Sequence, residues 1–118
     1  MLTIVLIDDD PISTFVTEKL ISKNVKEPCQ FFKYHSAKRA LEEIESINPN
    51  YLFLDLNMPE MNGWDFLDNF HPKENEAKIY ILSSSVDERD ITKASKYQIV
   101  QDYLSKPLIK KSIKTIFN

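Results

Sequence analysis

Residues 51–63 read YLFLDLNMPEMNG and combine a short apolar run with a tight turn. The run Tyr51–Leu54 has the length and character of a buried strand, and it delivers one carboxylate, Asp55, at its end. The chain then turns through Pro59 and Gly63, the only glycine in the protein. An ionised carboxylate that leaves water is costly unless a cation or hydrogen-bond donors compensate it. We therefore expect other parts of the chain to meet Asp55 at this position.

The composition is that of an ordinary globular domain of 118 residues with a formal net charge of −3. This slight acidic balance disfavours a nucleic-acid-binding domain, which usually carries a basic surplus. The single Cys29 excludes an intrachain disulfide and fits a reducing compartment. The sequence has neither a signal peptide nor an apolar stretch near the ~20 residues that span a bilayer. We therefore expect one domain, residues 1–118, in a cytoplasmic protein that binds neither nucleic acid nor membrane.

Apolar runs of strand length alternate with helical patterns along the chain. We expect strands at 2–7, 29–34, 51–54, 79–82 and 99–104, and helices at 11–22, 37–47, 64–70, 87–97 and 108–117. Asp10 and Ser36 stand where they can cap the first two helices. The first helix should face the core with an apolar stripe of Ile12, Phe15, Val16, Leu20 and Ile21. Such alternation predicts an α/β fold, with a parallel sheet and helices on both faces.

Polar side chains follow four of these strands. Asp8 and Asp9 follow the first strand, Asp55 the third, Ser83 the fourth and Lys106 the fifth. The carboxyl ends of parallel strands meet at one edge of the sheet, where such folds bind their ligands. Three carboxylates gathered there repel one another unless a cation intervenes, and oxygen ligands suit Mg²⁺. Together with a lysine and a hydroxyl they could perform phosphoryl transfer, with a carboxylate as the nucleophile.

Five motifs stand in order at the predicted strand ends: Asp8-Asp9, Leu54-Asp55-Leu56-Asn57-Met58-Pro59, Met61-Asn62-Gly63, Leu82-Ser83-Ser84 and Tyr103-Leu104-Ser105-Lys106-Pro107. With these motifs the whole chain resembles the receiver domain of two-component response regulators. The resemblance implies a flavodoxin-like (βα)5 fold, doubly wound, whose five parallel strands take the order 2-1-3-4-5. It also implies a function in phosphorelay signal transduction.

The resemblance further implies a role for each residue of the cluster. Asp55 would accept a phosphoryl group from a phosphohistidine of a sensor histidine kinase. Asp8, Asp9 and Asp55, with the backbone carbonyl of Asn57, would hold Mg²⁺ or Mn²⁺. Lys106 would pair with an oxygen of the phosphoryl group.

Other residues are implied to carry the signal onward. Ser83 would move toward the phosphoryl group, and the aromatic side chain of Tyr103 would turn inward with it. Asn57 and Ser85 occupy positions that tune the lifetime of the phosphoryl group. The output would be binding of a downstream target protein, or relay to a histidine phosphotransfer protein, through the face formed by 87–97, 99–104 and 108–117. The protein would be a monomer or a phosphorylation-dependent dimer, without an output domain of its own.

Two other classes of function share part of this pattern. An aspartate-nucleophile phosphatase of the haloacid-dehalogenase type needs a second carboxylate two residues after the nucleophile, where this chain has Asn57. A flavodoxin-like electron carrier needs a Ser/Thr/Gly-rich phosphate loop after the first strand, where aspartates would instead repel the FMN phosphate. We therefore expect a signalling phosphoacceptor that catalyses only its own phosphorylation and dephosphorylation, rather than an enzyme.

Overall fold

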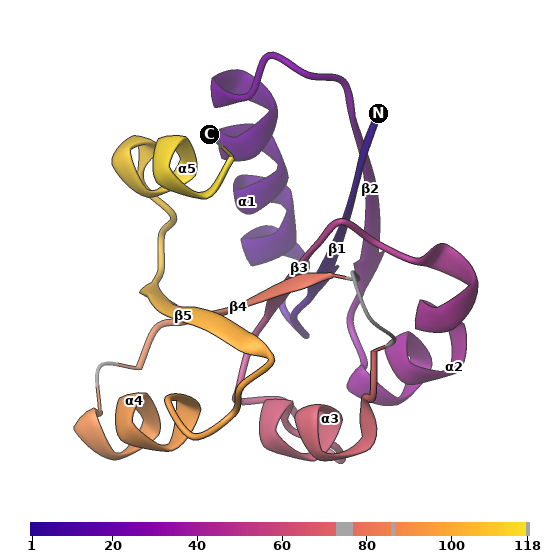
Figure 1. Cartoon of the computed structure of the whole chain (residues 1–118), viewed down its shortest axis with the longest axis vertical. Coiled ribbons are helices and arrows are strands. Elements are labelled where there is room, and N and C mark those ends of the chain that lie inside the picture. The colour runs from indigo at the N-terminus through magenta and orange to yellow at the C-terminus, as the bar shows by residue number, and fades with distance from the viewer. Residues whose placement is uncertain (73–76, 86, 118) are drawn as a thin grey trace.

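The computed structural model describes residues 1–72, 77–85 and 87–117 of the chain. Strands and helices alternate along it, and all have the predicted type (Figure 1). In chain order they are β1 (Leu2–Ile7), α1 (Pro11–Asn24), β2 (Cys29–Tyr34), α2 (Ala37–Ile47), β3 (Tyr51–Leu54), α3 (Gly63–Asn69), β4 (Lys78–Ser83), α4 (Glu88–Ala94), β5 (Val100–Ser105) and α5 (Lys110–Ile116). None of the described helices combines the length and apolar character that crossing a membrane requires.

The five strands form one parallel sheet in the order β2-β1-β3-β4-β5. This confirms the predicted flavodoxin-like fold. In Figure 1, α1 and α5 cover one face of the sheet, and α2, α3 and α4 cover the other. The strand order reverses at β1, because the chain first goes outward to β2 and then crosses to β3. A crevice therefore opens beyond the carboxyl ends of β1 and β3, where ligands of such sheets bind.

The central strands are buried on both faces, which explains their continuous apolar sequences. In β1, Val5 and Ile7 pack into the core cluster on the side of α2, α3 and α4. Ile4 and Leu6 point the other way and join the cluster that includes Ile21 of α1, together with residues of α5. A strand that contributes to two cores has no polar face, so its sequence does not alternate.

Local capping sets the starts of the first two helices as predicted. The carboxylate of Asp10 accepts a hydrogen bond of 3.0 Å from the backbone N–H of Ile12, and Pro11 occupies the first turn of α1. The hydroxyl of Ser36 accepts from the backbone N–H of Arg39 at 3.3 Å and begins α2. Because Asp10 is used as this cap, Asp8 and Asp9 are left as the pair directly beyond β1.

The predicted apolar stripe of α1 is confirmed at Ile21 and Leu20, which pack into the core, but is wrong for its other three residues. Ile12 is 72% exposed, Phe15 55% and Val16 40%. The buried residues of this helix are instead Thr14, Thr17 and Ile21. Burial of Thr14 is tolerated because its hydroxyl donates to the backbone carbonyl of Pro11 at 3.0 Å. Helix α1 therefore presents its largest apolar side chains to solvent, close to the carboxyl edge of the sheet.

Candidate functional site

The sheet brings the predicted carboxylates together at its carboxyl edge. Asp8 lies one residue beyond β1 and Asp55 one residue beyond β3, and these two strands are paired in register. Each carboxylate of Asp8, Asp9 and Asp55 offers an oxygen within 4.8 Å of the others. Asp8 and Asp55 are buried, at 6% and 7% exposure, while Asp9 is exposed. The cluster is therefore a nearly closed acidic pocket that opens to solvent through Asp9.

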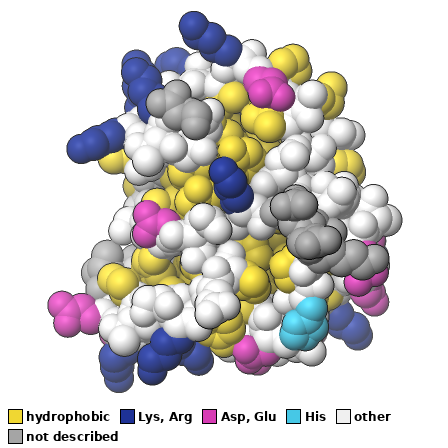
Figure 2. Space-filling model, in the orientation of Figure 1, with side chains coloured by type: hydrophobic (Ala, Val, Ile, Leu, Met, Phe, Trp, Pro, Cys, Tyr) yellow, Lys and Arg dark blue, Asp and Glu magenta, His cyan; other side chains and the backbone are white. Residues whose placement is uncertain are grey.

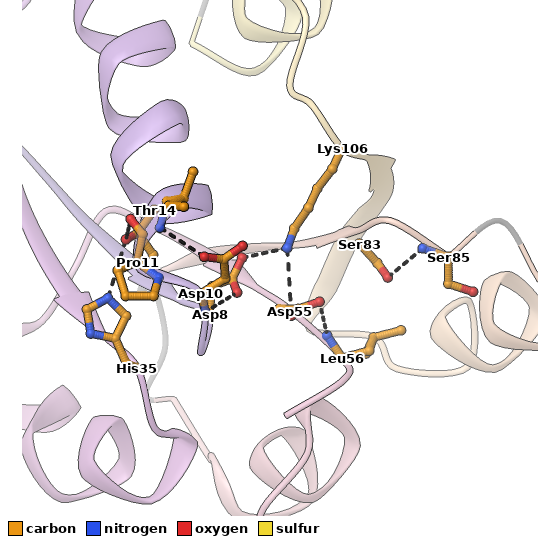
Figure 3. Close-up of polar contacts among 11 residues, drawn as sticks. Asp8, Asp10, Pro11, Thr14, His35, Asp55, Leu56, Ser83, Ser85 and Lys106 are labelled. Atoms are coloured by element: carbon orange, nitrogen blue, oxygen red, sulfur yellow. Dashed lines mark hydrogen bonds and ion pairs between the residues drawn. The ribbon is translucent and has the colours of Figure 1, made fainter. Parts of the chain in front are cut away.

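Lys106 reaches this cluster from the end of β5. Its Nζ lies 2.5 Å from Oδ2 of Asp8 and 3.7 Å from Oδ2 of Asp55 (Figure 3). The backbone N–H of Lys106 donates to the carbonyl of Ser83 at 2.9 Å, which continues the pairing of β4 and β5. The Lys106–Pro107 peptide bond is cis. The ammonium thus lies closer to Asp8 than to Asp55.

Asp8 and Asp55 lie beside the same ammonium, yet their pKa values shift in opposite directions. Burial raises the pKa of Asp8, but hydrogen bonds from Lys106 and Ser13 outweigh it and leave that pKa below its ordinary value. Burial raises the pKa of Asp55 to about 6, because the more distant Lys106 offsets only part of the effect and the charge of Asp8 adds to it. Ionisation of Asp55 therefore raises the free energy of the folded protein, and an added cation would offset this increase.

The backbone around Asp55 also contributes to the site. The N–H of Leu56 donates to Oδ1 of Asp55 at 2.9 Å, and the N–H of Asn57 also lowers its pKa. Gly63 donates to the carbonyl of Leu56 at 2.9 Å. A Cβ at position 63 would lie 2.6 Å from the carbonyl oxygen of Asp55, so only glycine fits there. Sequence reasoning treated Gly63 as a turn residue and missed this close approach; the signal was that the chain has no other glycine.

Ser83 is the last residue of β4, and Tyr103 lies in the neighbouring strand β5. Ser83 is fully buried, and its hydroxyl accepts from the backbone N–H of Ser85 at 3.1 Å (Figure 3). Tyr103 is half-buried, and its hydroxyl donates to the backbone carbonyl of Ser85 at 3.0 Å. The hydroxyl of Ser85 in turn donates to the carboxylate of Asp90 in α4, at 3.3 Å. Ser85 therefore connects Ser83, Tyr103 and α4, a set of contacts that no sequence pattern indicated.

The arrangement suits a hard divalent cation. The groups that converge are carboxylates, whose oxygens Mg²⁺ and Mn²⁺ prefer, and the exposed Asp9 leaves the cluster open to the waters that Mg²⁺ retains. Burial, and to a lesser extent the charge of Asp8, raises the pKa of Asp55, and a bound cation would stabilise its ionised form. The structure thus brings Asp8, Asp9, Asp55 and Lys106 together, while the roles of all predicted site residues stay predictions.

Comparison with known proteins agrees with this architecture. The family model for the response regulator receiver domain matches residues 4–118. The chain belongs to that family. It is thus a receiver domain of the two-component response-regulator class, whose members act as signalling phosphoacceptors.

Individual relatives and solved structures resemble this receiver domain in sequence and in fold. The nitrate/nitrite response regulator protein NarL of Escherichia coli K12 is 35% identical over 94 residues, which are 80% of this chain and 43% of NarL. A two-component response regulator from Cytophaga hutchinsonii has a crystal structure with a TM-score of 0.87 and 32% identity, and the match covers 98% of this chain and 93% of that one. The Mn²⁺-bound form of response regulator Rcp1 shares the fold, with a TM-score of 0.77 at 19% identity over 99% of this chain and 90% of that one. The chain thus spans less than half the length of NarL, so the predicted absence of an output domain stays a prediction.

Proposed function

We propose that Asp55 is the phosphoacceptor and that it takes the phosphoryl group from a phosphohistidine of a sensor histidine kinase. The observation that carries this proposal is the placement of Asp55. It is a buried carboxylate at the end of a central strand, within 4.8 Å of two further carboxylates and 3.7 Å from the Lys106 ammonium. Asp8 is paired with Lys106, and Asp9 is exposed, which leaves Asp55 as the buried nucleophile of the cluster.

The cation of the site would be held by Asp8, Asp9 and Asp55 with the backbone carbonyl of Asn57. The match to the family and the gathering of three carboxylates both support Mg²⁺ or Mn²⁺, and the related Rcp1 is described in a Mn²⁺-bound form. When bound, such an ion neutralises negative charge on the oxygens of a transferring phosphoryl group. With the cation present, Asp55 is expected to be ionised at neutral pH, as a nucleophile must be.

The chemical step is a displacement at phosphorus. An oxygen of the ionised Asp55 forms a bond to phosphorus as the bond between phosphorus and the donor's imidazole nitrogen breaks. The electron pair of that bond returns to the imidazole. Lys106 is placed to pair with a phosphoryl oxygen, and the hydroxyl of Ser83 can donate to another. The Lys106 ammonium and the Ser83 hydroxyl are already held at the carboxyl edge of the sheet before the reaction, so little rearrangement of these groups is needed during transfer.

The signal would leave the site through Ser83. If its hydroxyl turns toward the phosphoryl group, it gives up the hydrogen bond from Ser85, whose carbonyl holds Tyr103 and whose hydroxyl contacts α4. This chain of contacts supports a switch in which Ser83 and Tyr103 move together and change the face of α4, β5 and α5. That face would bind a downstream target protein or a histidine phosphotransfer protein. Asn57 and Ser85 flank the site and would tune the lifetime of the phosphoryl group.

Helix α1 offers a surface for the phosphodonor protein. Its exposed side chains Ile12, Phe15 and Val16 recur at helical spacing just after Asp9, so they lie at the entrance to the carboxylate cluster. Apolar side chains exposed together often mark a protein interface. We expect Phe15→Ala to slow phosphoryl transfer from a histidine kinase at least about tenfold, while leaving modification by acetyl phosphate unchanged. Ile91→Ala, a change at an exposed residue on α4, is the matched control.

The direct test of the proposed function uses acetyl phosphate with Mg²⁺ and intact-mass measurement. Wild-type protein should gain one phosphoryl group, and Asp55→Asn should gain none. Chelation of the metal should also prevent the modification. The proposal fails if Asp55→Asn is modified as readily as the wild type, or if the phosphoryl group is mapped to a different residue.

A further inference from the structure

A groove between α3 and α4 lies on a part of the surface that the phosphorylation chemistry does not use. Its volume is about 790 Å³. Its lining includes Asp68 of α3 and, from α4 and the turn that follows, Arg89, Thr92, Lys93, Lys96 and Tyr97. We refer to it below as the α3–α4 groove.

A stacked aromatic pair fixes the shape of this groove. The rings of Trp64 and Tyr97 have centroids 5.6 Å apart and planes at 24°. The Nζ of Lys93 lies 4.7 Å from the centroid of the Trp64 ring. The hydroxyl of Tyr97 donates to the carboxylate of Asp68 at 2.7 Å. These contacts tie α4 to α3, so a ligand would meet a largely preformed surface and lose less free energy to ordering.

The charge of the groove is opposite to that of the whole chain. The protein carries a net charge of −3, yet Arg89, Lys93 and Lys96 all line the groove. Lys and Arg side chains gather at the lower edge of the molecule in Figure 2, where Figure 1 places α4. Their spacing along the sequence, four and then three residues, places all three on one side of the helix and the turn after it.

The acidic groups nearby leave one end of the groove positive. Asp68 accepts the hydrogen bond from Tyr97, and Asp87 pairs with Arg89 at 2.8 Å. Glu88, which also lines the groove, lies in the first turn of α4, where the helix dipole stabilises a carboxylate. The carboxyl-terminal end of α4, with Lys93 and Lys96, is therefore the positive end.

We propose that the α3–α4 groove docks an acidic segment of a partner protein. Carboxylates of that segment would lie against Lys93 and Lys96, and an apolar side chain would rest on the ring of Tyr97 and the methyl group of Thr92. A nucleotide suits the groove less well, because Tyr97 and Lys93 already contact the Trp64 ring on which a base would stack. This surface is separate from the α1 surface proposed for the phosphodonor, and its docking needs no phosphoryl group.

The single tryptophan makes the proposal measurable, because Trp64 is the only source of indole fluorescence in the chain. The full chain is titrated with a peptide of alternating glutamate and leucine residues, and separately with a matched lysine and leucine peptide. The glutamate peptide should change the Trp64 emission in a saturable way, and its affinity should fall as salt is added. ADP, added alone, tests a nucleotide as the occupant. A response to the lysine peptide or to ADP that equals or exceeds that to the glutamate peptide overturns the proposal.

Charge reversal then locates the binding site. The double variant Lys93→Glu/Lys96→Glu should bind the glutamate peptide about tenfold more weakly, since it replaces two attractive charge contacts with two repulsive ones. Lys96→Glu alone leaves Lys93 on the Trp64 ring and should weaken binding about threefold, so the test holds even if the double variant is disturbed. Lys26→Glu/Lys38→Glu reverses two exposed lysines elsewhere and should stay within about twofold of wild type. Equal losses in the groove variants and this control, or no loss in either, overturn the proposal.

Discussion

The interior of the sheet and its carboxyl edge follow opposite rules. In the interior, Val5, Leu52 and Ile81 have no exposed surface and pack into the core cluster that α2, α3 and α4 cover. At the carboxyl edge, Asp8 and Asp55 are nearly as buried but carry like charges, and the pKa of Asp55 is raised to about 6. Within the described residues, every buried side-chain polar atom has a hydrogen-bond partner. The unfavourable energy at this edge therefore comes from buried charge and not from missing hydrogen bonds.

This contrast teaches that the interior is arranged for stability and the carboxyl edge for a ligand. Apolar burial stabilises the fold whether or not a ligand is bound, whereas the acidic cluster is stabilised further when a cation binds it. Without a cation, truncating an apolar residue of the interior and neutralising Asp55 at the edge should therefore change the free energy of unfolding with opposite signs.

The largest effect is expected from Leu52→Ala in the interior. Leu52 is fully buried in β3, so its truncation removes apolar contacts and leaves a cavity. The free energy of unfolding should fall by about 2–5 kcal/mol in urea titrations. Ile91→Ala, at a side chain that is 44% exposed, should change it by less than about 0.5 kcal/mol. Similar losses for both variants would contradict the assignment of Leu52 to the core.

Asp55→Asn at the edge should stabilise the metal-free protein. A carboxyl pKa raised from 3.8 to about 6 means that the folded state binds a proton more tightly than the unfolded state. Its stabilising contribution is thus fully present below the unfolded pKa and is lost as pH rises through about 6. Near pH 8 with a chelator, Asp55→Asn should therefore be more stable than wild type by about 1–3 kcal/mol. The difference should shrink as pH falls toward the unfolded value.

Asp8 supplies the contrasting control within the same cluster. Its pKa is lowered, so its ionised form stabilises the fold above the unfolded pKa, and that contribution is lost as pH falls through the folded value. Asp8→Asn should thus destabilise the metal-free protein at neutral pH. Equal signs for Asp8→Asn and Asp55→Asn would refute the different placement of Lys106 relative to the two carboxylates.

Divalent cations should stabilise the folded protein by neutralising the buried carboxylates at the carboxyl edge of the sheet. We assume that Mg²⁺ binds the folded cluster and not the unfolded chain. A free Mg²⁺ concentration of about 10–100 times its Kd should then raise the free energy of unfolding by about 1–3 kcal/mol. Thermal unfolding with MgCl₂, compared with NaCl at equal ionic strength, measures this. Asp9→Asn, an exposed change that removes one carboxylate, should reduce the gain. A gain that persists unchanged in Asp9→Asn would place the metal elsewhere.

The smallest effect is expected at Glu60, in the turn after Asp55. This residue has a φ of 66°, in the left-handed region that side chains other than glycine disfavour. Glu60→Gly should therefore raise the free energy of unfolding by about 0.5–1 kcal/mol, after the entropy gained by the unfolded chain is allowed for. Asn57→Gly, in the same exposed loop, should give no such gain. A loss of stability in Glu60→Gly would show that the strain is absent in solution.

Much of the fold could be predicted because local patterns and global arrangement agree. The apolar runs of β1, β3 and β4 are too continuous for a half-exposed strand, so they indicated a sheet covered on both faces. Helix α2 likewise follows its pattern, with Ala37, Ala40 and Ile44 buried after the Ser36 cap. The residues of the carboxylate cluster could be predicted for a related reason. Each follows a strand, and parallel strands end at one edge.

Helix α1 marks the limit of such reasoning. The apolar stripe predicted from its spacing is confirmed at Ile21, but its first three residues are exposed. On the side that faces the core, the helix buries two threonines beside Ile21. Amphipathic pattern alone cannot tell an apolar face that packs on the core from one that stays exposed. The side that packs on the core becomes clear only in the folded structure. There Thr14 can be buried, because its hydroxyl donates a hydrogen bond to the carbonyl of Pro11.

The sequence by itself determined the order of strands and helices, the caps and the gathering of Asp8, Asp9, Asp55 and Lys106. These follow from interactions between neighbours in the chain and from the shared edge of a parallel sheet. Only the tertiary structure decided how the Lys106 ammonium is divided between two carboxylates, 2.5 Å from Asp8 and 3.7 Å from Asp55. The opposite pKa shifts, the close approach at Gly63 and the α3–α4 groove were likewise decided there, because each depends on distances between residues that are far apart in the chain.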